Sequence, residues 1–61
     1  MPILQVEILK GRTQEQKREM VHQVTEAICK TLQCPPEAVT IMIREMEKEH
    51  FAVGGILYSD K

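Results

Sequence analysis

The feature that most constrains this fold is a single amphipathic segment, residues 13–32, between two short apolar runs. Thr13 and Gln16 have the spacing of a capping box, which predicts that a helix begins there. Apolar side chains then recur at helical spacing, at Met20, Val21, Val24, Ala27, Ile28 and Leu32. Because Pro35 and Pro36 cannot continue a helix, we expect one of about 18 residues that ends before them.

The apolar runs on either side of this helix read as β-strands. Residues 2–9 place Leu4, Val6 and Ile8 on one face, and residues 39–46 do the same with Val39, Ile41 and Ile43. Two strands joined through a helix form a right-handed β-α-β unit, so we expect them to be parallel. The predicted fold is therefore α+β, with one domain over residues 1–61.

The rest of the chain predicts a small C-terminal hairpin and an oligomer. Residues 51–58 read as a hairpin that turns near Gly54 and Gly55. A hairpin of this size is marginal alone, and we expect it to pair with a neighbouring subunit. One helix covers only one face of the sheet, and a chain of 61 residues has little room for a core. These features predict an obligate oligomer.

Composition argues against several classes of protein. The net charge is −1 and no basic stripe occurs, so we expect no nucleic-acid partner. No apolar run approaches the ~20 residues of a membrane span, so we expect no membrane partner. No signal peptide precedes Cys29 and Cys34, which favours a reduced, cytoplasmic protein without disulfides. The spacing of these cysteines does not match a zinc site, and we expect no metal.

Pro2 is the candidate for chemistry, because it directly follows Met1. Methionine aminopeptidases remove Met1 when the next side chain is small, which would leave Pro2 with a free secondary amine. An α-amino group has a pKa near ~8, against ~10.4 for lysine. Burial or a nearby cation lowers that pKa, so a terminal proline can serve as a general base at neutral pH. The alternative is that Pro2 has no role, since many chains begin with Met-Pro.

Several segments, taken in order, resemble the small-subunit 4-oxalocrotonate tautomerases. The matching segments are Pro2 and residues 8–13, 15–17, 24–28, 44–46 and 50–55, and the resemblance covers nearly all of residues 2–61. It implies a tautomerase fold and a homohexamer built as a trimer of dimers. It also implies a cofactor-independent tautomerase with the amino-terminal proline as its base. The implied substrate is an anionic 2-hydroxy-dienoate or 2-keto acid, such as 2-hydroxymuconate from bacterial aromatic hydrocarbon catabolism.

The same resemblance implies roles for three further residues. Arg12 matches the arginine that binds the distal carboxylate of the substrate, and Phe51 matches the aromatic residue that forms a wall of the pocket. The backbone of Leu9 is a further candidate for the lining. The alternative for Arg12 is a solvated loop cation, and for Phe51 it is a core or interface phenylalanine.

Thr40 departs from the family pattern. By register it takes the place of a second arginine, which polarises the carbonyl end of the substrate, and threonine carries no charge. Arg44 lies on the same strand face, but about 13 Å away, too far for a simple replacement. Arg44 either faces the site of another subunit or forms a surface ion pair with Glu45 or Glu47. We therefore expect weakened or altered activity toward 2-hydroxymuconate.

Three alternative functions remain open at this point. One is a promiscuous phenylpyruvate-type tautomerase. Another is a haloacrylate hydratase or dehalogenase, in which a charged proline acts as an acid, although no carboxylate to activate water is evident. The third is a non-catalytic oligomeric module that retains the scaffold.

Overall fold

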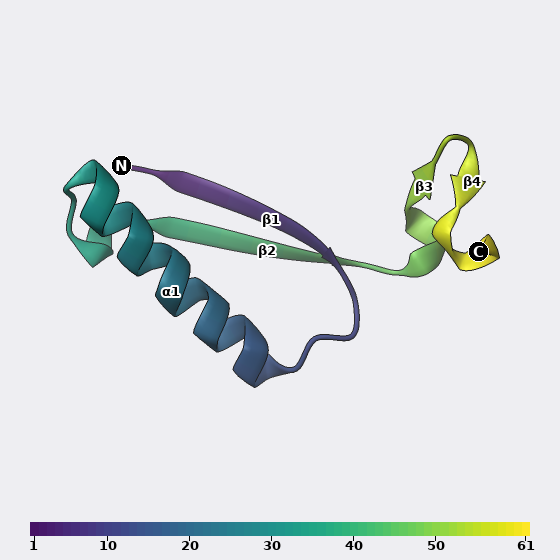
Figure 1. Ribbon diagram of the computed structural model, residues 1–61, viewed down its shortest axis with the longest axis horizontal. Helices are drawn as coiled ribbons and strands as arrows, with labels where there is room; N and C mark the ends of the chain where they lie inside the picture. The colour runs from purple at the N-terminus through teal and green to yellow at the C-terminus, as the bar shows by residue number, and fades with distance from the viewer.

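The computed structural model describes residues 1–61 and has the expected β-α-β order followed by a hairpin. The helix α1 lies across one side of the strands β1 and β2, and the hairpin projects away from them at the far end (Figure 1). Three 3-10 turns occur, at Pro36–Ala38, Lys48–His50 and Tyr58–Asp60. The main elements are β1 (Ile3–Leu9), α1 (Gln14–Leu32), β2 (Thr40–Met46), β3 (Ala52–Val53) and β4 (Ile56–Leu57).

β1 and β2 form a parallel pair, which confirms the predicted β-α-β unit. Their register runs from Ile3 opposite Thr40 to Leu9 opposite Met46. β2 begins one residue later than predicted, because the Val39 amide donates to the Pro36 carbonyl and so closes the preceding 3-10 turn.

The capping box starts α1 as the sequence predicted. The Gln16 amide donates to Thr13 Oγ1 at 3.1 Å, and the Thr13 amide donates to Gln16 Oε1 at 2.9 Å. The helix ends because Gln33 adopts a left-handed conformation, with φ 55° and ψ 59°, before the prolines are reached. None of the helices is long and apolar enough to cross a membrane.

The apolar stripe of α1 differs from the predicted one at two positions. Ala27 is exposed, because it lies on the flank of the stripe. Leu32 is 60% exposed, because α1 is about 28 Å long and extends past strands of about 23 Å. The half-buried helix residues are Lys17, Met20, Val21, Val24, Thr25, Ile28 and Cys29.

The single chain has no closed core. None of its residues is buried, and its accessible surface is 4964 Å². A compact protein of 7.0 kDa would expose about 4,000 Å². The radius of gyration is 14.6 Å, whereas a compact domain of this length has about 10.5 Å. The excess surface follows from the flat shape of 43 × 24 × 13 Å and from the projecting hairpin (Figure 1).

Apolar surface remains open on both parts of the chain. On the sheet face that lacks a helix, Ile3 is 61% exposed and Met42 is 47% exposed. On the hairpin, exposed apolar side chains are Val53, Ile56, Leu57 and Tyr58. This confirms that one helix covers only one face of the sheet. A soluble protein would have to bury these surfaces against other chains.

Thr13→Ala should destabilise the protein by about 1 kcal/mol, because the Gln16 amide loses its partner at the helix start. Urea unfolding at fixed protein concentration measures the change. Thr31→Ala is the matched control, since the Thr31 hydroxyl donates only to carbonyls of its own helix, those of Ala27 and Ile28. Equal losses in both variants would contradict a specific role for the cap.

Met42→Lys should weaken assembly by at least about tenfold, because it places an unpaired charge on the open sheet face. Light scattering over a dilution series measures the species present. Ala27→Lys makes a similar change on the exposed flank of α1 and should leave assembly intact. Unchanged assembly of Met42→Lys would show that this face is not an interface.

Candidate active site

Pro2 and Thr40 lie together at the amino end of the sheet. The Thr40 amide donates to the Pro2 carbonyl at 3.0 Å, which fixes the backbone of Pro2 just before β1 begins. Pro2 itself is half-buried, whereas Met1 is 90% exposed. Thr40, the position that departs from the family pattern, is therefore adjacent to Pro2, the candidate base.

Leu9, Arg12 and Phe51 lie toward the opposite end of the molecule. β1 separates Pro2 from Leu9 by about 23 Å, because each strand residue adds about 3.3 Å. Arg12 follows in the loop after β1, and Phe51 follows β2 on the way to the hairpin. The N-terminus and the hairpin lie at opposite ends of the chain (Figure 1). One chain therefore brings together Pro2 and Thr40, but not Pro2 with Arg12 or Phe51.

Arg12 borders a small open pocket beside the start of α1. The pocket measures about 210 Å³ and is lined by Ile8, Arg12, Gln16, Lys17 and Met20. The preceding Gly11 has φ 130°, a conformation that strains other residues, and this turn leads the chain from β1 to Arg12. Arg12 belongs to none of the ion pairs of the chain. Its planar guanidinium is therefore free for a carboxylate.

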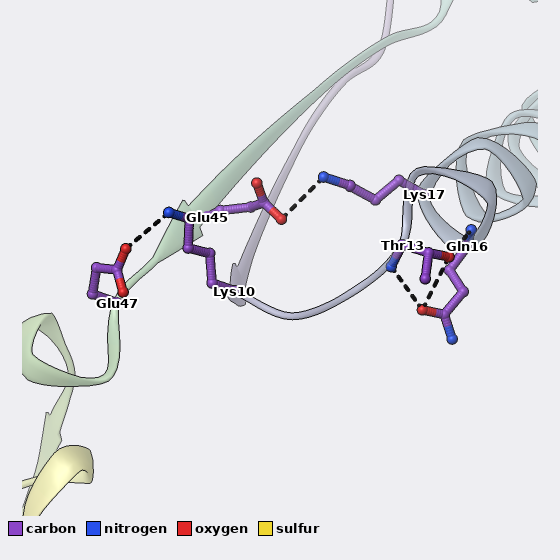
Figure 2. A network of polar contacts seen from close by, with 6 residues as sticks. All are labelled: Lys10, Thr13, Gln16, Lys17, Glu45 and Glu47. Atoms are coloured by element: carbon purple, nitrogen blue, oxygen red, sulfur yellow. Dashed lines mark hydrogen bonds and ion pairs between the residues drawn. The ribbon is translucent and has the colours of Figure 1, made fainter.

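Two ion pairs brace the elements on either side of this loop, as Figure 2 shows. Lys17 on α1 contacts Glu45 on β2 at 3.0 Å, and both side chains are less than one-third exposed. Lys10 after β1 contacts Glu47 after β2 at 2.9 Å. The hydrogen bond and charge of Glu47 raise the pKa of Lys10, and Lys10 in turn lowers the pKa of Glu47. No group of three or more His, Cys, Asp or Glu side chains could hold a metal ion.

The expected surface ion pair of Arg44 with Glu45 or Glu47 is wrong. Neighbouring strand residues point to opposite faces, so Glu45 turns toward Lys17 on the helix side while Arg44 points away from it. Glu47 is instead paired with Lys10. Arg44 is exposed and lies opposite Glu7 in the parallel register. Its other alternative, a role in the site of another subunit, stays a prediction.

Phe51 packs on its own hairpin in the single chain. Its ring centroid lies 5.8 Å from that of Tyr58, and the Tyr58 amide donates to the Phe51 carbonyl at 2.8 Å. These contacts close the base of the β3–β4 hairpin. Phe51 is half-buried, so part of its ring remains available to another chain.

The sequence reasoning missed Lys17, whose side chain lines the pocket beside Arg12. Lys17 falls in the matching segment 15–17 but was assigned no role from the sequence. A signal was present: it lies four residues after the helix cap Thr13, in the first turn after the Arg12 loop. Its charge contributes to a positive environment at this pocket, although Glu45 offsets part of it.

Comparisons with known proteins agree along nearly the whole chain. Residues 2–61 match the family model described as tautomerase enzyme. A 2-hydroxymuconate tautomerase from Pseudomonas sp. strain CF600 is 49% identical over 55 residues, 90% of this chain and 87% of that protein. A solved 4-oxalocrotonate tautomerase isozyme from Methylibium petroleiphilum has a TM-score of 0.93 at 46% identity, covering 97% and 92% of the two chains.

A second solved structure bears on assembly. A heterohexamer 4-oxalocrotonate tautomerase from Chloroflexus aurantiacus has a TM-score of 0.91 at 32% identity. The match covers 98% of this chain and 97% of that one. The chain fold described above is therefore also found in a hexameric assembly.

Proposed function

The chain belongs to the tautomerase enzyme family, and we propose that Pro2, freed by removal of Met1, is its general base. The proposed substrates are anionic 2-hydroxy-dienoates or 2-keto acids, of which 2-hydroxymuconate is one. The name of the 49% identical Pseudomonas protein supports this substrate class. The observation that carries the proposal is the position of Pro2, anchored by Thr40 at the very start of the sheet.

Removal of Met1 changes the chemistry of the Pro2 nitrogen. Bound to Met1, that nitrogen is an amide and has no basic lone pair. Once free, it is a secondary amine with an ordinary pKa near ~8, and a cation supplied by another chain would lower this value. The neutral nitrogen takes a proton from the enol hydroxyl of the substrate. The resulting ammonium then returns the proton to a carbon further along the conjugated chain.

The proposed active site is shared between subunits. Pro2 lies about 23 Å from Leu9, so the cation and the aromatic wall have to come from other chains. Arg12 is suited to bind a carboxylate because its guanidinium group has no ion-pair partner within the chain. Phe51 would exclude water from the site and strengthen its charge interactions. A homohexamer arranged as a trimer of dimers is the proposed assembly, and the open apolar faces support it.

Thr40 bears on how fast the proposed substrates are turned over. No cation takes its place beside Pro2 within the chain, because Arg44 lies four residues further along β2. Loss of one donor that stabilises a developing oxyanion costs about 10²–10³ in rate. We therefore propose weaker turnover of 2-hydroxymuconate than an enzyme with arginine at position 40 would show. Phenylenolpyruvate, the second substrate candidate, has its one carboxylate beside the enol and lacks the distal carboxylate that Arg12 is proposed to bind.

Mixing two inactive variants tests both the base and the shared site. Pro2→Ala and Arg12→Gln should each lower turnover of 2-hydroxymuconate by at least about 10², because the first removes the base and the second removes the cation that binds the distal carboxylate. When the two are unfolded and refolded together, about one site in four regains both groups and activity returns. Ultraviolet absorbance measures turnover, and intact mass checks that Met1 is absent.

Arg18→Gln is the matched control for charge, since Arg18 on α1 is already paired with Glu15. It should retain the wild-type rate. A Pro2→Ala variant as fast as wild type would exclude the proline base and favour another mechanism or a non-catalytic module. Failure of the mixture to regain activity, with both variants assembled, would contradict a site shared between chains.

Thr40→Arg should raise kcat/KM for 2-hydroxymuconate by about tenfold or more, because it restores a cation beside the proposed base. The value for phenylenolpyruvate, which has the same carbonyl end, should rise as well. Thr40→Gln, which adds length without charge, is the control. An equal gain in both variants would show that charge at position 40 is not the cause.

A further inference from the structure

Two cysteines meet at the C-terminal end of α1, away from Arg12 and its pocket. Cys29 lies in the last turn of the helix, and Cys34 follows the left-handed residue Gln33. The amides of Gln33 and Cys34 both donate to the Cys29 carbonyl, the latter at 3.3 Å. Where a left-handed residue ends a helix in this way, the side chain of the residue after it commonly packs against a side chain of the last helical turn. Here both side chains are thiols.

The exposure and the electrostatics of the two thiols also indicate that they lie close together. Both cysteines are free and half-buried. Burial raises the pKa of Cys29, and the charge and hydrogen bonding of the Cys34 thiol raise it further, with smaller effects from Glu37 and Glu26. Cys29 also lines an open groove on α1, so small reagents can reach it from solvent.

We propose that Cys29 and Cys34 form a dithiol site, which small-molecule disulfides oxidise to an intramolecular disulfide. One cysteine thiolate attacks a sulfur of the reagent, forming a mixed disulfide and releasing one thiolate. The second cysteine thiolate then attacks the first cysteine's sulfur, forming the internal disulfide and releasing the other thiolate. The two cysteine protons end on the two released thiols, and the reagent is reduced by two electrons.

The new bond would tie α1 to the segment that leads into β2. Cys34 begins this segment, which continues through the turn Pro36–Ala38 to Thr40. Thr40 in turn holds the carbonyl of Pro2. The disulfide would therefore close a short loop beside the amino end of the sheet, and oxidised protein should unfold at a higher temperature than reduced protein.

Equilibration of the assembled protein with mixtures of reduced and oxidised glutathione tests the proposal. Free thiols are trapped with iodoacetamide, and peptide mapping by mass spectrometry identifies a link between Cys29 and Cys34. Any flexible peptide with this spacing forms some disulfide, so the same protein in concentrated urea is the reference. The folded arrangement should raise the equilibrium constant for the disulfide by at least about tenfold over the unfolded chain.

The matched control moves one thiol and keeps the number of thiols constant. In Cys34→Ser combined with Thr31→Cys, the two thiols lie two residues apart on a helix and do not face each other. This variant should lose the tenfold advantage and gain only glutathione adducts. The proposal is overturned if folded wild type has no advantage over unfolded, or forms only glutathione adducts or disulfides between chains.

Discussion

The packing of one helix against one face of a two-stranded parallel sheet is the constraint on which the rest of this structure depends. α1 half-buries the helix side of β1 and β2, while Ile3 and Met42 on the other face stay about half exposed. Since no residue of the single chain is buried, hydrophobic burial in this protein is incomplete without further chains. Folding and assembly are therefore expected to share the same driving force. The hairpin adds to this dependence, because its apolar side chains have no helix of their own to cover them.

The same geometry shapes the chemistry available to the chain. A parallel sheet places Pro2 and Thr40 at one end and the Arg12 loop at the other, at a distance that no side chain spans. Lys17 and Lys10 form ion pairs with Glu45 and Glu47, whereas Arg12 has no partner. A tautomerase built on this chain would draw its base and its substrate-binding cation from different subunits. Assembly would then be a condition for activity as well as for stability.

Much of the secondary structure could be predicted from short-range patterns. The capping box of Thr13 and Gln16, the two-residue alternation of the strands and the glycine turn of the hairpin all depend on neighbours in the chain. The predictions that were wrong concern the places where the helix and the sheet meet. Leu32 belongs to the apolar stripe but lies beyond the sheet, and the pairing proposed for Arg44 overlooked which face each acidic residue occupies. Pro2 was singled out because it directly follows Met1, whereas the other candidate site residues were named from a family resemblance; the roles of all of them are proposals.

The order of helix and strands, their approximate ends and the surplus of apolar surface follow from the chain alone, because hydrogen bonding and side-chain periodicity act over a few residues. Three features depended on the tertiary structure. They are the ion-pair partners of Glu45 and Glu47, the separation of Pro2 from Arg12, and the proximity of Cys29 to Cys34. Strand register, element length and the left-handed turn at Gln33 decide these features. They bring together, or hold apart, residues whose spacing in the sequence does not by itself fix their distance in space.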